Sequence, residues 1–110
     1  DIEGKRMRTV FDFTIENAHQ KISLEEIATI ANMSKNAFCK YFKKRTNKTY
    51  ISFLTELRIE NACQILKSKE EFSIAEIAFK SGFNNISNFN RKFKEVKNVT
   101  PFSYRLSNGI

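Results

Sequence analysis

The stretch "SIAEIAFKSGFNNISNFNRKF" (73–93) carries the signals for two short helices joined by a tight corner. Ser73, followed three residues later by Glu76, has the capping-box pattern found where a helix begins. Gly82 is the residue type that tolerates a left-handed backbone where a helix ends. The asparagines that follow it suit a turn and the cap of a new helix. The stretch therefore predicts a helix-turn-helix.

The same organisation occurs a second time, earlier in the chain. Segment 23–33 resembles 73–83 at an offset of 50 residues, and 38–53 resembles 89–104 at an offset of 51. The matched pairs include Ser23 with Ser73, Glu26 with Glu76, Ala28 with Ala78, Phe38 with Phe89, Phe42 with Phe93, Asn47 with Asn98 and Thr49 with Thr100. So many matches in one register predict two copies of a single helix-turn-helix unit.

Helical periodicity predicts further helices outside the two copies. Apolar residues recur every three to five positions through 49–67, which predicts a helix of about five turns, roughly 28 Å long. At the end of the chain, Thr100 and Pro101 are the residue types preferred just before a helix and at its first position. A first helix is indicated upstream by the spacing of Met7, Val10, Phe11, Ile15 and Ala18, which we expect to face the first copy.

These patterns predict an all-α fold of about seven helices, in which a long linker helix joins two helix-turn-helix subdomains. We expect one domain over 1–110, with the first subdomain at 6–48, the linker helix at 49–67 and the second subdomain at 72–107. Hydrophobic residues make up 41% of the chain, which is enough for a packed core. Three glycines and one proline leave few helix breakers.

The composition narrows the range of functions. The formal net charge of +7 and the pI of about 9.6 indicate a polyanionic partner, either nucleic acid or anionic lipid. His19, Cys39 and Cys63 are the only histidine and cysteines, so we expect no structural zinc, no disulfide framework and no cofactor. No apolar run approaches the ~20 residues of a membrane span, and the N-terminus lacks the apolar core of a signal peptide. We expect a cytoplasmic, nucleoid-associated protein, and leave open whether the chain is part of a longer one.

Positive charge gathers on the second helix of each copy and just beyond it. Residues 34–50 hold six lysines and arginines and no acid, and residues 84–106 hold five against Glu95 alone. A helix fits the major groove of DNA, where arginine reads guanine, asparagine reads adenine and serine reads either. Lysines beside it neutralise phosphates and fix the register. Two such helices on one chain would enter successive major grooves, about 34 Å apart, and read a continuous, asymmetric site.

Helical spacing places one group of residues on the side of each helix away from its phenylalanines: Asn36, Cys39, Lys40 and Lys43 in the first copy, and Ser87, Asn88, Arg91, Lys92 and Glu95 in the second. The candidates for contact with bases are Asn36, Cys39, Lys40, Ile86, Ser87, Asn88 and Arg91. The candidates for contact with phosphates are Lys35, Lys43, Lys44, Lys92 and Lys94. Ile86 either touches a thymine methyl or packs beside the turn, and Cys39 is either a small neutral side chain near DNA or a redox sensor. For each residue taken singly, an ordinary solvated helix face is the alternative.

Other functions fit the sequence less well. An enzyme is disfavoured, because the chain has one histidine, no phosphate-cradling glycine loop and no paired carboxylates at a plausible site. A protein-docking module would expose apolar anchors, whereas these faces expose lysine, arginine, asparagine and serine. An RNA-binding domain would need an aromatic stacking platform, but the phenylalanines lie at core spacing. Duplex DNA is therefore the expected partner.

Two segments resemble a known family. "EIAFKSGFNNISNFNRKFKEVKNVTPFSYR" (76–105) resembles the second-motif signature of the C-terminal DNA-binding domain in the AraC/XylS family of bacterial transcription regulators. "LRIENACQIL" (57–66) is similar to the linker of that family, and the likeness extends over about 22–106. The resemblance implies two helix-turn-helix subdomains that read promoter DNA, activation through contact with RNA polymerase, and a separate effector-sensing or dimerising domain.

The departures from the family pattern are mild. Asn47 and Asn98 stand where the family usually has glycine, and Tyr50 stands where proline is usual. Asparagine also tolerates the left-handed conformation, so both turns are expected to form.

Overall fold

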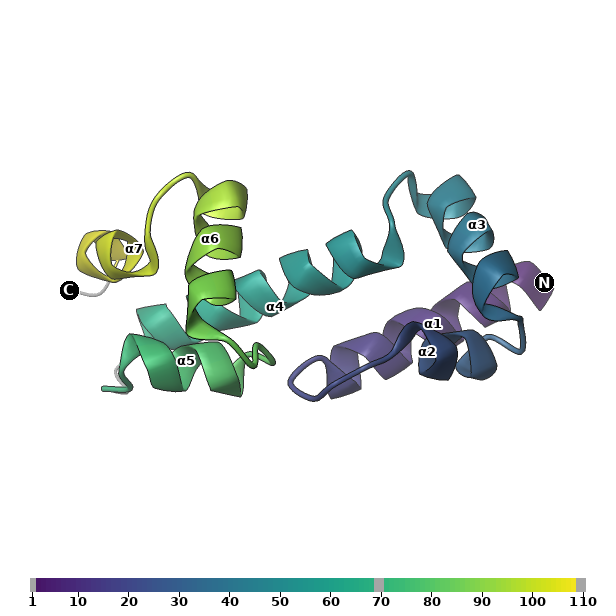
Figure 1. The fold of residues 1–110 in the computed structure, drawn as a ribbon, viewed down its shortest axis with the longest axis horizontal. Coiled ribbons are helices and arrows are strands. Elements are labelled where there is room, and N and C mark those ends of the chain that lie inside the picture. Colours follow the sequence, from purple (N-terminus) through teal and green to yellow (C-terminus); the bar gives the residue numbers. More distant parts are fainter. Residues whose placement is uncertain (1, 69–70, 109–110) are drawn as a thin grey trace. The chain divides into compact units, whose positions relative to one another are not determined.

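The computed structural model describes residues 2–68 and 71–108, and all regular structure within those ranges is α-helical (Figure 1). The helices are α1 (Ile2–Asn17), α2 (Leu24–Ile30), α3 (Lys35–Thr46), α4 (Tyr50–Lys67), α5 (Ile74–Lys80), α6 (Ile86–Lys97) and α7 (Pro101–Asn108). The predicted all-α fold of about seven helices is thereby confirmed. None of the helices so described is long and apolar enough to cross a bilayer.

The chain forms two compact units, Asp1–Leu54 and Thr55–Ile110, and the division between them falls inside α4. The first unit contains one helix-turn-helix, formed by α2 and α3, and the second contains another, formed by α5 and α6. The finer division into subdomains at 6–48 and 72–107 with a linker helix at 49–67 stays a prediction.

The core of the first unit is built around Phe42, whose side chain is fully buried. Its ring centroid lies 5.4 Å from that of Tyr50, in an edge-on arrangement, and 5.8 Å from that of Phe38, one turn earlier on α3. Ile27 and Ala28 provide the buried face of α2. The small Ala28 side chain, 2% exposed, lets α2 approach α3 closely.

The buried face of α1 differs at one position from the face predicted from the sequence. Ile15, expected to face the core, is 60% exposed, whereas its neighbour Thr14 is completely buried. The Thr14 hydroxyl donates to the carbonyl oxygen of Val10 at 2.7 Å and accepts from the hydroxyl of Tyr50 at 2.7 Å. Because both of its hydrogen bonds are made inside the unit, threonine is accommodated where an unpaired hydroxyl would be costly.

The second unit repeats this plan with Phe89 and Phe93 of α6, both fully buried. Their ring centroids lie 5.7 Å apart, and Phe93 meets Tyr104 of α7 edge-on at 5.5 Å. The rest of this core is formed by Ile59, Ala62, Cys63, Leu66, Ile77, Ala78 and Phe83. Since the phenylalanines of α3 and α6 fill the cores, the opposite faces of both helices are left to solvent.

Glycine and asparagine form the corners, as the sequence predicts. Gly82 follows α5 with a φ of 105°, and Asn32 follows α2 with a φ of 59°. Asn47 and Asn98 end α3 and α6 with φ values of 67° and 65°, and each donates its backbone N–H to the carbonyl oxygen four residues earlier at 2.8 Å. Asparagine thus forms the left-handed turns for which glycine is the more usual residue.

Serine caps begin the first helix of each helix-turn-helix. The Ser23 hydroxyl accepts from the N–H of Glu26 at 3.0 Å, and the Ser73 hydroxyl accepts from that of Glu76 at 3.1 Å. In the second unit, the Glu76 carboxylate also accepts from the backbone N–H of Ser73 at 2.9 Å, which completes the capping box. This backbone hydrogen bond lowers the pKa of Glu76.

The capping box predicts an acid-sensitive contribution to the stability of the second unit. The pKa of Glu76 is lower in the folded chain, so its stabilising effect is present above the unfolded-state pKa of 4.5 and is lost as the pH falls through the folded-state pKa. We expect Glu76→Gln to flatten the pH dependence of the urea midpoint below about pH 4.5. Glu26→Gln, the equivalent change in the first unit, is the matched control. An equal flattening in both variants would contradict a specific role for the capping box.

Candidate nucleic-acid interface

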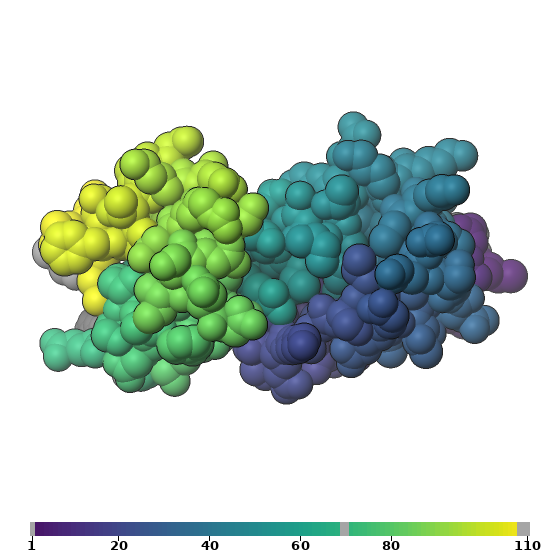
Figure 2. All heavy atoms as spheres, in the orientation of Figure 1, coloured from purple at the N-terminus to yellow at the C-terminus, as the bar shows by residue number. Residues whose placement is uncertain are grey.

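The outer face of α3 is polar and basic. Phe38 and Phe42 point into the core, so residues on the other side of the helix are directed to solvent. The blue side chains of this segment lie at the surface of the first unit in Figure 2. The exposed side chains on this face are Asn36, Lys40, Lys43 and Lys44.

The outer face of α6 carries the corresponding polar side chains, and Figure 2 shows the green segment that contains this helix at the surface of the second unit. Ser87, Arg91 and Lys94 are exposed, and Asn88 is half-buried. Ile86, at the first position of the helix, is 39% exposed, which is compatible with both of its predicted roles. Ser87, Asn88 and Arg91 therefore lie on the side of α6 away from Phe89 and Phe93, whereas Ile86 lies nearer the side of those phenylalanines.

Two hydrogen bonds link three polar residues at the start of α6, one to a backbone N–H and one between side chains. The side-chain oxygen of Asn85, which caps the helix, accepts from the backbone N–H of Asn88 at 2.8 Å. The side-chain oxygen of Asn88 accepts in turn from Nη2 of Arg91 at 2.6 Å. A guanidinium has only donors, so the amide of Asn88 must present its oxygen to it. Sequence spacing places Asn88 and Arg91 on one face but does not reveal this bond.

Two of the predicted phosphate contacts form ion pairs. Lys35 Nζ lies 3.4 Å from Glu25 Oε2, and Lys92 Nζ lies 3.4 Å from Glu95 Oε2. Both pairs are exposed to solvent, so each contributes little to stability and is easily exchanged for a phosphate. Because that exchange releases a carboxylate near the DNA, Lys35 and Lys92 are weaker candidates than the lysines at the centre of each face.

Two other basic residues have structural partners. Lys97 hydrogen-bonds to the carboxylate of Glu60 on α4, and this bond raises the pKa of Lys97. Arg105 of α7 donates to the carbonyl oxygen of Phe72. The count of basic residues in the sequence thus overstates the number of cations that are available to a polyanion.

Cys39 lies at the edge of the α3 face and not at its centre. It is half-buried and lines a hollow of about 370 Å³ together with Leu24, Thr49, Tyr50 and Ile51. Its contact with a base stays a prediction.

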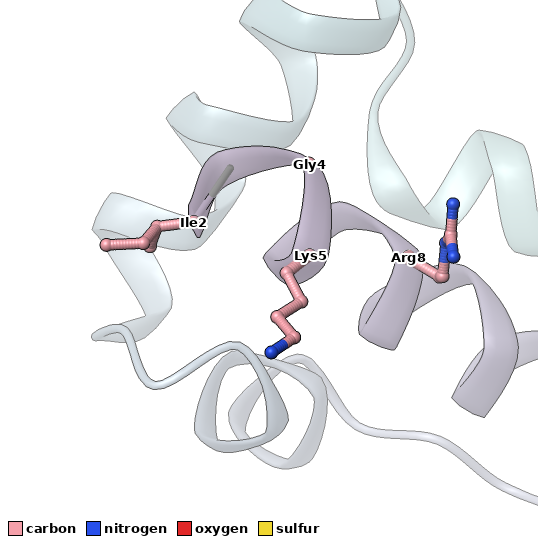
Figure 3. A pocket seen from close by; sticks show the side chains of 4 residues that line it. All are labelled: Ile2, Gly4, Lys5 and Arg8. Carbon is pink, nitrogen blue, oxygen red and sulfur yellow. The ribbon is translucent and has the colours of Figure 1, made fainter.

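Another hollow, of about 430 Å³, lies along α1 (Figure 3). It is lined by Ile2, Gly4, Lys5 and Arg8, and the close-up shows Lys5 and Arg8 projecting in different directions. Their cations therefore do not converge on one ligand. In the part of the chain that the structure describes, no three histidine, cysteine or acidic residues are grouped to hold a metal ion. Neither feature competes with the outer faces of α3 and α6 as the candidate site.

Comparison with known sequences finds a helix-turn-helix family over most of the chain. The family model described as "Helix-turn-helix domain" matches residues 27–107. An uncharacterised HTH-type transcriptional regulator of Bacillus subtilis, YdeC, is 33% identical over 107 residues, which cover 97% of this chain and 36% of that protein. The chain thus spans about a third of the length of that relative.

Solved structures give a consistent result. The C-terminal domain of AraT, a response regulator from Geobacillus stearothermophilus, matches with a TM-score of 0.88 and 27% identity over 96% of this chain and 87% of that one. The DNA-binding domain of AdpA, a global transcriptional factor, matches with a TM-score of 0.81 and 26% identity over 89% and 87% of the two chains. The AdpA domain is in complex with a target DNA.

Proposed function

Because the chain belongs to the AraC family of DNA-binding transcription regulators, which are not enzymes, we propose that it reads double-stranded promoter DNA with the outer faces of α3 and α6. The outer face of α6 supports this proposal most strongly, since Ser87 and Arg91 are exposed there while Phe89 and Phe93 are buried on the opposite face of the helix. Arginine suits guanine, and serine suits several bases, so this face has the chemistry of a recognition helix.

We propose that the two helices occupy successive major grooves of one site, about 34 Å apart along the duplex. The two faces differ, because Asn36 and Lys40 of α3 stand where Ser87 and Arg91 stand in α6. The site would therefore be asymmetric. A hydroxyl-radical footprint is expected to show protection in two adjacent helical turns, and protection confined to one turn would contradict the arrangement.

Lysines beside the reading residues would fix the register on the phosphates. Lys43 and Lys94 occupy equivalent positions on α3 and α6, and both are exposed. Lys44 is exposed next to Lys43, whereas α6 has Glu95 at the equivalent position. We infer that α3 supplies more of the electrostatic attraction and α6 more of the sequence preference.

Binding to duplex DNA is expected to weaken steeply with salt, because each lysine that neutralises a phosphate releases condensed counterions. In a plot of log affinity against log salt concentration, Lys43→Ala and Lys94→Ala should each make the slope shallower by about one and weaken all sequences alike. Lys5→Ala, on α1, is the control and should leave the slope unchanged. A flat slope for the wild-type chain would reject the proposed function.

The setting of this activity is also a proposal. Regulators such as YdeC are longer than this chain, so an effector-sensing or dimerising domain would belong to the rest of a full-length protein. Contact with RNA polymerase at a promoter would make the protein an activator, acting on the nucleoid in the bacterial cytoplasm. Transcription from the selected operator in a purified system, with and without the protein, would decide between activation and repression.

A further inference from the structure

The hydrogen bond between Asn88 and Arg91 separates the roles of these two residues on α6. We propose that Asn88 is a positioning residue, which holds the Arg91 guanidinium ready for a guanine and does not itself read a base. This inference rests on the proposed DNA-binding function, and it replaces the assignment of Asn88 as a base contact.

The bonds that end at Arg91 begin at the helix cap. Asn85 accepts from the backbone N–H of Asn88 at 2.8 Å, which fixes the first turn of α6 and the point from which the Asn88 side chain leaves it. Asn88 then accepts from Nη2 of Arg91 at 2.6 Å, one turn further along the same face. Asn88 is half-buried and Arg91 is exposed, so Asn88 is the less mobile partner to which the Arg91 guanidinium is bonded.

Hydrogen-bonding capacity distinguishes a positioning role from a reading role. An asparagine that reads adenine needs its amide oxygen as an acceptor and its amide nitrogen as a donor at the same time. The oxygen of Asn88 already accepts from Arg91, so one lone pair remains for adenine, and the amide could read that base only in the orientation that Arg91 imposes on it. Arg91 loses nothing comparable, because the bond uses one of the two hydrogens on Nη2. Donors remain for the O6 and N7 acceptors of guanine.

Holding the guanidinium before DNA arrives should improve recognition. Immobilising a long side chain on binding weakens the complex by about 2- to 10-fold, since rotamer freedom is lost. When the bond to Asn88 restricts Arg91 in the free protein, part of that loss occurs on folding and not on binding. The resulting gain in affinity applies only to a guanine that the restricted Arg91 guanidinium can contact. Discrimination at that base pair therefore increases.

The first unit lacks this device and so offers an internal comparison. Ala37 and Lys40 occupy the positions equivalent to Asn88 and Arg91, at the offset of 51 residues. Alanine has no side-chain acceptor, and an ammonium is a point charge without the planar fork of arginine. We therefore expect the half-site under α6 to tolerate fewer substitutions than the half-site under α3.

The test uses the full chain and a duplex that the wild-type protein selects from random DNA, with variants of that duplex changed at single base pairs. Asn88→Ala is expected to reduce discrimination at the base pair read by Arg91 by about 2- to 10-fold, without changing the salt slope. Asn88→Asp keeps an oxygen acceptor and should restore the discrimination, although its charge weakens binding to every duplex. In an Arg91→Ala background, Asn88→Ala should have no further effect on discrimination.

Several outcomes would overturn the proposal. If Asn88→Ala still lowers discrimination in the Arg91→Ala background, Asn88 reads a base itself. If folded Asn88→Ala discriminates as well as the wild type, the hydrogen bond has no role in recognition. Circular dichroism would verify that the variant is folded, and alanine at this helical position is not expected to disturb α6. If the wild-type chain selects no duplex sequence, the proposed function fails and the role of Asn88 fails with it.

Discussion

Replacement of Arg91 by alanine is expected to remove most of the preference at one base pair of the selected duplex, while binding to unrelated duplexes persists. Arg91 is exposed on the outer face of α6, and its guanidinium matches the O6 and N7 acceptors of guanine. A good bidentate contact discriminates against the wrong base by about 1–3 kcal/mol, or roughly 5- to 150-fold. Competition binding with single-base-pair variants of the duplex would measure the loss directly.

Two matched variants separate base reading from charge. Arg91→Lys keeps the positive charge but not the planar fork, so it should lose the same preference with a smaller loss of overall affinity. Lys94→Ala removes a cation from the same face and should weaken all sequences alike. If Arg91→Ala also weakened every sequence equally, Arg91 would be a phosphate contact and its assignment as a base contact would be wrong.

The caps and corners of this fold are predictable from the sequence, because each depends on one residue and its immediate neighbours. A serine followed three residues later by a glutamate favours a capping box at the start of a helix, as Ser73 and Glu76 form in α5. Gly82 permits the left-handed corner that follows that helix. The internal repeat makes the prediction much stronger, since two copies with matching caps and phenylalanines must bury the same helix faces. It also identifies the outer faces of α3 and α6 as the candidate site, by exclusion of the core.

Features that depend on tertiary approach or on side-chain rotamers are not predictable in this way. Thr14 replaces Ile15 on the inner face of α1 because Tyr50, far away in the sequence, offers its hydroxyl as a partner. The bond from Arg91 to Asn88 depends on a choice of rotamers that helical spacing does not fix. Sequence reasoning thus locates the candidate face, whereas the proposed roles of single side chains on it depend on their hydrogen-bond partners.

Replacement of Phe89 by alanine is expected to lower the free energy of unfolding of the second unit by about 3–5 kcal/mol. Phe89 is fully buried, and its ring lies 5.1 Å from that of Phe83 and 5.7 Å from that of Phe93, so its loss leaves a cavity between aromatic neighbours. Small domains have a net stability of only about 5–15 kcal/mol, so this variant should be close to unfolding in its second unit. Urea unfolding followed by circular dichroism would give the change.

Amide hydrogen exchange would show where that stability is lost. Phe89→Ala should reduce protection in α5 and α6, and sequence-specific binding should fall with it because Arg91 is no longer held on a rigid helix. Phe102→Ala is the control, since Phe102 is 60% exposed and its removal should change the free energy of unfolding by less than about 0.5 kcal/mol. Similar losses in the two variants would mean that Phe89 is not the anchor of α6. If protection stayed intact while DNA binding was lost, Phe89 would have to contact DNA itself. That result would contradict the complete burial of its side chain.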